Sequence, residues 1–441
     1  MLRSAHRLGP GILAILCWHA FGNAEYCHAE SLSYIDATQS ATINSFDTRI
    51  ARVQAQEYKA DARAAKADYY PTLSTFFAGE FDKGLGSQSA QSLFSVGGTT
   101  VNAMTRVQNL LAMQANWTLF DFGARHFNVR AAERSYQAAM LGVDTAVRDM
   151  RLQMVELYCQ ALTAYKVMKQ KQTAVTVYRK LFDMKKRTYE AGAISRVDLG
   201  EQSLQLAQAE DSIKESREVL TEKLRELSGL THAIYDVDSV ELLDFPQTTA
   251  AKPVIFTPQL TPDYRKYALQ IASKQAEIHS LLAQKLPKIN FYGGYMLYGT
   301  NKGNVGAAWQ NFGSRLANGG ISLQWNAFDG FKNAAERQRK KAEIAELRLQ
   351  RDKRLWQLQS EYEKANATLT PLGAQMVTKA EIINRGKQKI DMYTRLSDNE
   401  ISDRTALLTQ QVQLLEQNLA ADKIRVQQDA AAEKLRILAG G

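Results

Sequence analysis

An internal duplication constrains what this chain can fold into more than any other feature of its sequence. The segment 117–123 recurs as 325–330, a helix-like segment that ends in proline precedes each copy, and a long polar run follows it. The same signals return in the same order about 210 residues later, which predicts one architecture built from two similar halves. The residues that mark the two copies are Pro71, Trp117, Phe120 and Asp121, and then Pro287, Trp325, Phe328 and Asp329.

The repeat pattern divides the chain into four segments. These are a signal peptide at 1–29, a first repeat at 30–230, a linker at 231–261 and a second repeat at 262–441. Each repeat is predicted to contain a helix, a pair of strands and a long helical hairpin. The strand pairs are expected at 71–121 and 287–328, and the hairpins at 125–228 and 331–438.

The first 29 residues have the pattern of a secretory signal peptide. A positive start is followed by a short apolar core at 11–20 and by small residues, and we expect cleavage after Ala29 or Ala24. The shortness of the core argues against an uncleaved anchor. Leu16 precedes Cys17, where a lipid-modified cysteine usually follows a small residue, so a lipoprotein is not the preferred interpretation.

The charge balance and the cysteine content exclude few functions. The net charge of +9 fits anionic lipid, acidic cargo or simply well-solvated helices, and export makes nucleic acid the poorest partner. After cleavage at Ala29 only Cys159 remains, which builds no disulfide framework.

Two short segments in each repeat have the pattern of strands with one face in apolar surroundings. Apolar Met113, Trp117 and Leu119 alternate with polar residues, for example. No run of roughly 18 apolar residues occurs after residue 30, so any membrane insertion would use strands of this kind. Ordinary soluble hairpins are the alternative. The strands are expected at 72–82, 112–121, 289–297 and 321–326, with polar loops at 83–111 and 300–318.

A very long helical run follows each strand pair. The runs at 125–190 and 331–398 each contain about 66 residues, enough to extend ~100 Å. Gly192 and Asn399 stand where the chain turns back, and Ser195 and Ser402 are expected to cap the returning helices.

The remaining helices are about half as long. We expect the returning helices to stack end to end with the short helices at 33–68 and 262–285, beside the long ones.

Four strands cannot close a membrane barrel, because single-chain barrels begin at about eight strands and lipid does not tolerate open edges. Three copies would supply twelve strands and close by cyclic symmetry. The predicted fold is therefore an α+β membrane protein with internal duplication. Its four transmembrane strands join a shared 12-strand trimeric barrel, and its coiled-coil hairpins form a periplasmic tube.

The duplicated motif, the prolines that start the strands and the turn at 189–195 resemble the TolC family of outer-membrane efflux and type I secretion channels. The resemblance covers nearly all of the chain after the predicted signal peptide. It implies a homotrimer in the bacterial outer membrane that contacts lipid and extends into the periplasm. It also implies a periplasmic adaptor (membrane fusion) protein and an inner-membrane transporter of the ABC or RND type as partners, with drugs or secreted polypeptides as cargo. No cofactor is expected.

The family resemblance further implies acidic residues just after the tip turns, which narrow the inner entrance. Asp198 and Glu201 fit this in the first repeat, whereas Thr405 and Leu408 occupy the matching positions of the second. We expect a looser or differently charged gate, and acids that merely favour helix N-termini are the alternative. The candidate tip and gate residues are Tyr189, Gly192, Ile194, Ser195, Asp198, Glu201, Asp398, Asn399, Ile401, Ser402 and Asp403.

We find no catalytic or metal-binding pattern in the sequence. His126, His232 and His279 have no ligand-spaced partners, and no phosphate-cradling glycine loop occurs. Asp121 and Asp329 each follow a strand and open a helix, so capping explains them. The prediction is a channel and not an enzyme. The alternative is an exported periplasmic coiled-coil scaffold or adaptor protein without a pore.

Overall fold

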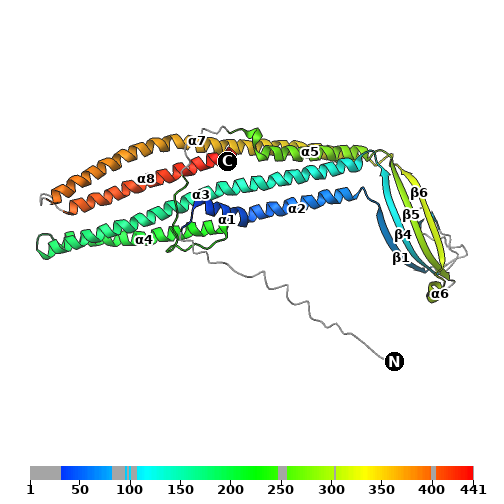
Figure 1. Ribbon diagram of the computed structural model, residues 1–441, viewed down its shortest axis with the longest axis horizontal. Helices are drawn as coiled ribbons and strands as arrows, with labels where there is room; N and C mark the ends of the chain where they lie inside the picture. The colour runs from blue at the N-terminus through cyan, green and yellow to red at the C-terminus, as the bar shows by residue number, and fades with distance from the viewer. Residues whose placement is uncertain are drawn as a thin grey trace, which may run out of the picture. The chain divides into compact units, whose positions relative to one another are not determined.

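The computed structural model describes residues 31–81, 95–96, 99–100, 107–246, 256–301, 304–398 and 404–440 (Figure 1). The predicted signal peptide and parts of the loop 83–111 and of the linker lie outside them. The helices are α1 (Tyr34–Asn44), α2 (Phe46–Ala67), α3 (Ala124–Glu190), α4 (Arg196–Thr231), η1 (Pro258–Leu260), α5 (Pro262–Ala283), α6 (Val305–Gln310), α7 (Lys332–Asp398) and α8 (Arg404–Leu438). The strands are β1 (Thr72–Phe81), β2 (Ser95–Val96), β3 (Thr99–Thr100), β4 (Val107–Phe120), β5 (Lys288–Asn301) and β6 (Ser314–Gln324).

The chain divides into two compact units, which are described separately. The hairpin unit comprises residues 1–49, 147–255 and 362–441, and the sheet unit comprises 50–146 and 256–361. The division falls within α2, α3 and α7, so each of these helices contributes to both units.

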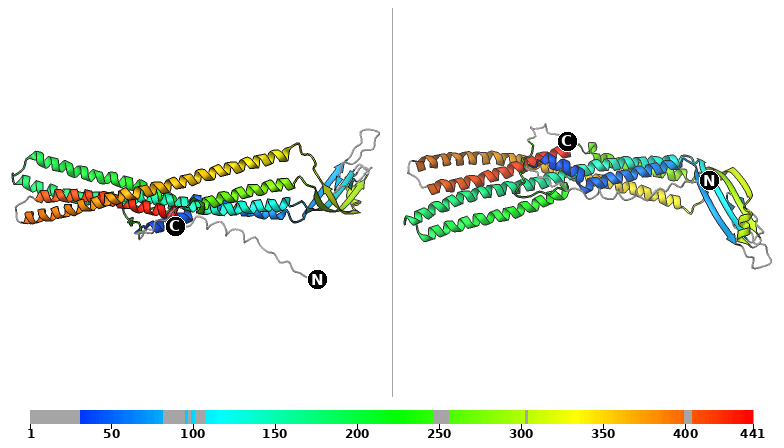
Figure 2. Two further views of the ribbon diagram at one scale, coloured as in Figure 1. Left: turned by 90° about the horizontal axis from the view of Figure 1, so that it is seen from above. Right: turned by 60° about the horizontal axis from the view of Figure 1, so that its bottom comes forward.

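The long helices form where the sequence predicts them. α3 and α7 each contain 67 residues, and α7 continues through Pro371 although proline lacks the N–H that a helix interior uses. In the hairpin unit α4 runs back beside α3, and α8 beside α7 (Figure 2). None of the described helices combines the length and the hydropathy that crossing a membrane requires.

The helix predicted at 33–68 is two helices. Ser45 has extended geometry (φ −53°, ψ 132°) and ends α1, while its carbonyl accepts from the N–H of Arg49 and so begins α2. The buried hydroxyl of Thr48 also donates to the Ser45 carbonyl at 2.9 Å. Within α1, Ala37 and Ala41 are fully buried, whereas the predicted apolar position Ile43 is 58% exposed. Local hydrogen bonding of Ser and Thr therefore breaks a run that periodicity alone reads as continuous.

The four longer strands form one antiparallel sheet in the order β1-β4-β5-β6. β4 and β5 pair along their length, for example Trp117 opposite Phe291, with a bulge between Thr118 and Phe120. This pairing joins the two repeats through backbone hydrogen bonds. β1 and β6 are the edges, and within the described chain each has a strand on one side only.

Three strands are longer than the sequence predicts. β4 begins at Val107 and not at 112, β5 reaches Asn301, and β6 begins at Ser314 inside the predicted loop. Register explains the extension, because Val107 pairs with Phe81 on one side and with Asn301 on the other. The predicted loop 300–318 also contains α6, whose N-cap Asn304 accepts from two backbone N–H groups.

The hairpin unit is held by a buried aromatic cluster. The rings of Tyr34, Tyr158 and Phe245 lie with centroids 5.0 to 5.7 Å apart. The Tyr158 hydroxyl lies 2.8 Å from the carbonyl oxygen of Leu32 and 2.7 Å from that of Leu243. Burial raises the pKa of Tyr158 well above its usual range, so this group stays a neutral donor. It ties the start of the described chain to the segment that follows α4.

We expect Tyr158→Phe to lower the free energy of unfolding by about 1 kcal/mol, because the hydroxyl proton shared between the carbonyls of Leu32 and Leu243 is lost, while the Leu32 carbonyl still accepts from the Leu243 N–H. Chemical unfolding of the purified protein in detergent, followed by circular dichroism, measures this. Tyr165→Phe is the matched control, since Tyr165 also lies on α3 but is only partly buried and its hydroxyl bonds to none of the described residues. Equal losses of stability in the two variants would show that the hydrogen bonds of the Tyr158 hydroxyl do not stabilise the hairpin unit.

Candidate functional site

The duplicated motif builds the same strand–helix junction twice in the sheet unit. Trp117 Nε1 donates to the carbonyl of Tyr69 at 2.8 Å, and Trp325 Nε1 donates to the carbonyl of Lys285 at 3.0 Å. Each carbonyl stands two residues before the proline that precedes β1 or β5. Each tryptophan thus joins the end of one strand to the start of the neighbouring strand. The proline and the tryptophan of each repeat, far apart in the sequence, lie close together as a result.

The aspartates of the motif cap the long helices. Asp121 Oδ2 accepts from the Arg125 N–H at 3.0 Å, and Asp329 Oδ2 accepts from the Asn333 N–H at the same distance. Asp121 also pairs with the Arg125 guanidinium at 2.9 Å. These contacts are what the capping interpretation predicts.

Two successive residues after each aspartate have left-handed backbone geometry. They are Phe122 and Gly123 (φ 53° and 85°) and Gly330 and Phe331 (φ 64° and 65°). Glycine therefore occupies the second position in one repeat and the first in the other, so each repeat keeps one strained phenylalanine. The ring centroids of Phe120 and Phe122 lie 4.7 Å apart. In the second repeat, those of Phe328 and Phe331 lie 5.5 Å apart. The sequence analysis missed Phe122 and Phe331, and the shared Phe–Gly composition after the aspartates was the available signal.

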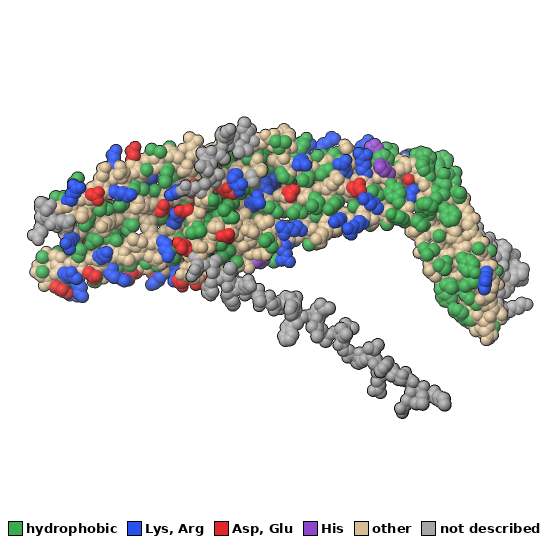
Figure 3. Space-filling model, in the orientation of Figure 1, with side chains coloured by type: hydrophobic (Ala, Val, Ile, Leu, Met, Phe, Trp, Pro, Cys, Tyr) green, Lys and Arg blue, Asp and Glu red, His purple; other side chains and the backbone are tan. Residues whose placement is uncertain are grey.

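The sheet has one exposed apolar face. Pairing places alternate residues of the four strands on this side, and Leu73, Ile321 and Leu323 are each about 70% exposed. Figure 3 shows hydrophobic side chains gathered over the strands, whereas charged side chains lie mainly over the helices. The apolar face comprises Leu73, Phe77, Leu111, Met113, Trp117, Phe291, Tyr295, Leu297, Ala317, Ile321 and Leu323.

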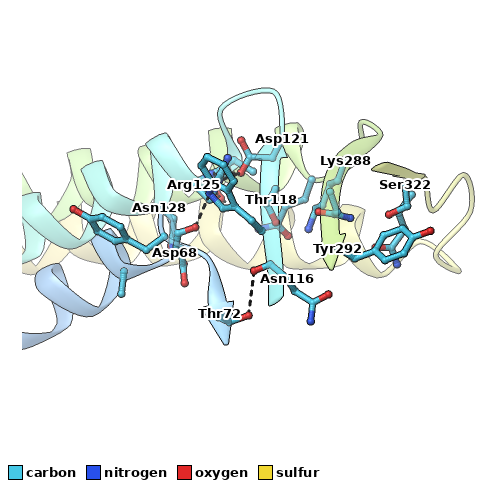
Figure 4. A pocket seen from close by; sticks show the side chains of 18 residues that line it. Asp68, Thr72, Asn116, Thr118, Asp121, Arg125, Asn128, Lys288, Tyr292 and Ser322 are labelled. Atoms are coloured by element: carbon cyan, nitrogen blue, oxygen red, sulfur yellow. Dashed lines mark hydrogen bonds and ion pairs between the residues drawn. The ribbon is translucent and has the colours of Figure 1, made fainter. Parts of the chain in front are cut away.

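The opposite face carries amides and hydroxyls at the end near the helices, and a small buried apolar cluster of Leu110, Ala112 and Met296 at its far end. Its hydrophilic part is called the polar face here. It borders a pocket of about 920 Å³ into which side chains of β4, β5 and β6 project, together with Asp68 and Arg125 from the helix ends (Figure 4). Arg125 is held by Asp121 and by the Asp68 carbonyl at 3.1 Å. The polar face comprises Thr72, Asn116, Thr118, Lys288, Asn290, Tyr292, Ser322 and Gln324. Such a surface offers hydrogen bonds to water and to polar solutes, and it has no acid–base or nucleophilic set.

Aromatic residues mark both ends of the apolar face. At the far end, Trp309 of α6 stacks on Phe77 at 5.3 Å and on Phe312 at 5.4 Å. The sequence analysis also missed Trp309, because it lies in the predicted polar loop. At the helix end the group comprises Trp117, Phe120, Phe122, Trp325, Phe328 and Phe331.

The first hairpin tip, in the hairpin unit, has the predicted geometry. Gly192 has φ +74°, its N–H bonds to the Tyr189 carbonyl at 2.8 Å, and the Ala193 N–H bonds to the Thr188 carbonyl at 3.0 Å. This is a Schellman turn, which left-handed glycine favours. Tyr189 is 39% exposed and Ile194 is half-buried.

Ser195 and Asp198 form a capping box at the start of α4. The Asp198 N–H bonds to Ser195 Oγ at 3.2 Å, and the Ser195 N–H bonds to Asp198 Oδ2 at 3.0 Å. Hydrogen bonds from the Ser195 hydroxyl and backbone hold the pKa of Asp198 below its usual range. Asp198 therefore has a structural task at the tip, and a gate role for it and for exposed Glu201 stays a prediction.

The second hairpin tip is described only in part. Asp398 ends α7, and the predicted residues Asn399, Ile401, Ser402 and Asp403 lie outside the described residues. Across the residues that the structure does describe, no group of three or more His, Cys, Asp or Glu side chains could hold a metal ion.

A comparison with known families finds a similarity in the first half of the chain. A family model described as outer membrane efflux protein matches residues 37–231. These residues are similar to the outer membrane efflux protein family. The family resemblance inferred from the duplicated motif is thereby confirmed, and the family is one of outer-membrane proteins rather than of enzymes. No curated protein matches the sequence.

Solved structures extend the similarity to almost the whole chain. The outer membrane channel CmeC of Campylobacter jejuni is 13% identical with TM-score 0.73, covering 100% of this chain and 93% of its own. The outer membrane protein VceC of Vibrio cholerae is 16% identical with TM-score 0.71, covering 92% and 96%. The outer membrane channel MtrE of Neisseria gonorrhoeae is 15% identical with TM-score 0.67, covering 92% and 89%. At these identities the likeness concerns the fold, and it confirms the predicted combination of helical hairpins and strands.

Gly192→Ala should destabilise the first tip by about 1 kcal/mol, because alanine is strained in left-handed geometry. Steric conflict does not contribute, since nothing lies within 4 Å of an added Cβ. Gly200→Ala is the matched control: it is equally open but helical, so it should stabilise α4 by roughly 0.5–1 kcal/mol. Hydrogen exchange of the tip amides measures both. Stability changes of opposite sign support the left-handed geometry at Gly192. If both substitutions stabilise the tip, that geometry is refuted.

The capping box predicts a pH dependence that is local to the tip. A carboxyl with a lowered pKa stabilises the fold above its unfolded pKa of about 3.9, and the stabilisation is lost as pH falls through the folded pKa. We expect the hydrogen-exchange protection factors of the first α4 amides to drop below about pH 4. Asp198→Asn should remove this dependence and Glu201→Gln should keep it. A drop of the same size in Asp198→Asn would exclude the carboxylate as its source.

Proposed function

We propose that this protein is the exit duct of a tripartite efflux or type I secretion system. Three copies assemble into a 12-strand barrel that spans the outer membrane, and their helical hairpins form a tube in the periplasm. An inner-membrane transporter of the ABC or RND type delivers cargo, and a periplasmic adaptor protein joins the transporter to the duct. The polar face of the sheet lines the water-filled passage.

The polarity of the sheet is the observation that carries this proposal. A sheet in water normally buries its apolar face and solvates its polar face. Here the apolar face is the more exposed one, and Met113 in its centre is 44% exposed. A row of exposed apolar side chains on a regular strand is the arrangement of a lipid-facing barrel wall. The exposed face therefore supports insertion into a membrane and argues against a water-soluble scaffold.

The edges of the sheet support assembly from several copies. β1 and β6 each have backbone groups on one side that no described strand pairs. Unpaired backbone groups in lipid cost several kcal/mol each, so a membrane sheet has to close. Pairing β6 of one copy with β1 of the next closes a ring, and three copies provide the twelve strands that the predicted architecture requires.

The two aromatic groups support a membrane-spanning height. About ten residues separate Trp325 at the helix end from Arg315 near the other end of β6. At about 3.3 Å per residue and a tilt of about 40°, this distance spans roughly 25 Å, which is the height of an outer-membrane apolar band. Aromatic girdles flank that band in barrels of this kind.

Exposed apolar residues on the helices of the sheet unit support contacts between copies. On α2, Ile50 and Val53 are 53% and 62% exposed, and on α7, Leu349 and Trp356 are 72% and 71% exposed. Each pair lies on one helical face, at a spacing of three or seven residues. Neighbouring copies in a ring would bury these stripes against each other.

A groove in the hairpin unit supports an adaptor-binding surface. The helices α3, α4 and α8 border a pocket of about 410 Å³ that contains Lys171, Tyr178 and Glu416. Lys171 donates to the Ser212 carbonyl at 3.0 Å, and burial with the charge of Glu416 raises the pKa of Tyr178. A groove between helices that has both apolar and polar residues can bind a helix of a partner protein.

Met113→Lys tests the proposal directly. In a barrel wall the lysine would face lipid near the bilayer centre and cost about 2–4 kcal/mol per copy, so trimers and planar-bilayer conductance should be lost. Gln114→Lys is the matched control, because the neighbouring residue lies on the polar face and should leave both intact. Trimer mass by light scattering and single-channel recording are the measurements. A Met113→Lys protein that assembles and conducts like the unmodified protein would favour the poreless scaffold.

A further inference from the structure

Arg315 is a charged residue in an otherwise uncharged surface. Among the described side chains of β1, β4, β5 and β6, it is the only charged one on the apolar face. Register places it in one row across the sheet, because Arg315 pairs with Leu297, Leu297 with Leu111, and Leu111 with Phe77. Arg315 and Phe77 therefore occupy the two edge strands at the same level.

The Arg315 guanidinium is exposed, and no hydrogen bond or ion pair joins it to the described residues. Its neighbour in the register, Leu297, is apolar. A cation on a lipid-facing surface costs about 2–4 kcal/mol at the midplane and much less near the interface. Arg315 lies at the far end of the face, at a height of roughly 25 Å from Trp325 along the membrane normal of the proposed barrel, where such a charge is tolerated and where headgroups lie.

The helix α6 brings a flat aromatic surface to the same end of the apolar face. It packs on β4 and β5, and its approach depends on Gly299, since an added Cβ there would lie 2.1 Å from the Ala308 carbonyl oxygen. This contact fixes Trp309, which is 49% exposed and stacks between Phe77 and Phe312. Tryptophan with an exposed edge prefers the membrane–water interface.

We propose that Arg315, supported by the Trp309 stack, binds a phosphate group of an outer-leaflet lipid, of the phosphorylated glycolipid class represented by lipid A. The inference rests on the proposed function, because it requires the apolar face to contact lipid. The guanidinium offers a planar set of donors that matches phosphate oxygens in a bidentate fashion. The acyl chains of the same lipid would lie along the apolar residues below this row. Arg315 and Phe77, on which Trp309 stacks, lie at the same level on opposite edge strands, about 14 Å apart across the sheet. The phosphate would therefore contact Arg315, and another part of the same lipid would contact the aromatic surface.

The lipid assignment follows from the surroundings of Arg315. A carboxylate partner within the chain would neutralise it, and the described apolar face contains no Asp or Glu. A charge that only protects an edge strand from unwanted pairing needs no aromatic surface at the same level. An Arg without a charged partner among the described residues, an anchored Trp and a continuous apolar surface are together complementary to an anionic headgroup attached to acyl chains.

Native mass spectrometry of the full assembly in neutral detergent, titrated with diphosphoryl lipid A, tests the proposal. We expect Arg315→Gln to weaken lipid A binding about tenfold, as loss of a charge-assisted hydrogen bond predicts. The lipid A affinity of Arg315→Lys should fall between those of the unmodified protein and Arg315→Gln, since lysine keeps the charge but cannot bind phosphate in a bidentate fashion. Lys332→Gln is the control for net charge, because it removes one exposed lysine at the other end of the sheet and should bind as the unmodified protein does.

Two further titrations identify what is bound. Lipid A without phosphates should bind the unmodified protein as weakly as lipid A binds Arg315→Gln. Inorganic phosphate should not compete at millimolar concentration, because it cannot use the aromatic surface. Unchanged binding in Arg315→Gln, or equal binding of the dephosphorylated lipid, would overturn the proposal. Aggregation of Arg315→Gln with normal lipid A binding would do the same and indicate an edge-protecting role.

Planar-bilayer conductance of the same preparations separates this inference from the proposed function. A conducting Arg315→Gln protein with weakened lipid A binding supports both. Conductance with unchanged lipid A binding refutes the lipid site alone, whereas absence of conductance and of trimers in the unmodified protein refutes the duct and the lipid site with it.

Discussion

The backbone hydrogen bonding of a four-stranded sheet with two open edges governs the rest of this structure. Each edge strand presents N–H and C=O groups that lipid cannot satisfy, and the exposed side of the sheet is apolar. Both features are costly in an isolated chain, and closing a ring of copies relieves the first while lipid relieves the second. The β4–β5 pairing matters for the same reason, because it makes one continuous sheet out of two repeats that would otherwise expose four edges.

The two strand–helix junctions share the same hydrogen bonds although their sequences differ. Both repeats keep a tryptophan whose indole donates to the carbonyl that precedes the neighbouring strand, and both keep an aspartate that caps the long helix. They differ in which of two left-handed positions is glycine, so Phe122 and Phe331 bear the strain in turn. Each phenylalanine costs about 1 kcal/mol in that conformation, and its ring contact with Phe120 or Phe328 at the helix end of the sheet is of similar size.

The sequence correctly predicted the features that depend only on residues close together in the chain. The ends of α3 and α7, the glycine turn at 192 and the Ser195 cap depend on neighbours within a few residues, and they lie where the pattern places them. The early start of β4 and the packing of α6 depend on partners far along the chain. Tyr158 is the clearest case, because a tyrosine in a long helix gives no sign that its hydroxyl meets carbonyls of residues 32 and 243.

The distribution of charge separates a membrane sheet from a soluble one more sharply than apolar content does. Of the sheet's alternating positions whose side chains are described, only Arg315 and Lys288 are charged. They lie at opposite ends of the sheet and on opposite faces, since Lys288 pairs with Gln324 near the helices and Arg315 pairs with Leu297. The central rows contain no charge on either face. A soluble sheet has no reason to keep charges out of its middle, because water solvates them equally well at every height. A bilayer does, since the cost of a charge falls from about 2–4 kcal/mol at the midplane to near zero at the interfaces.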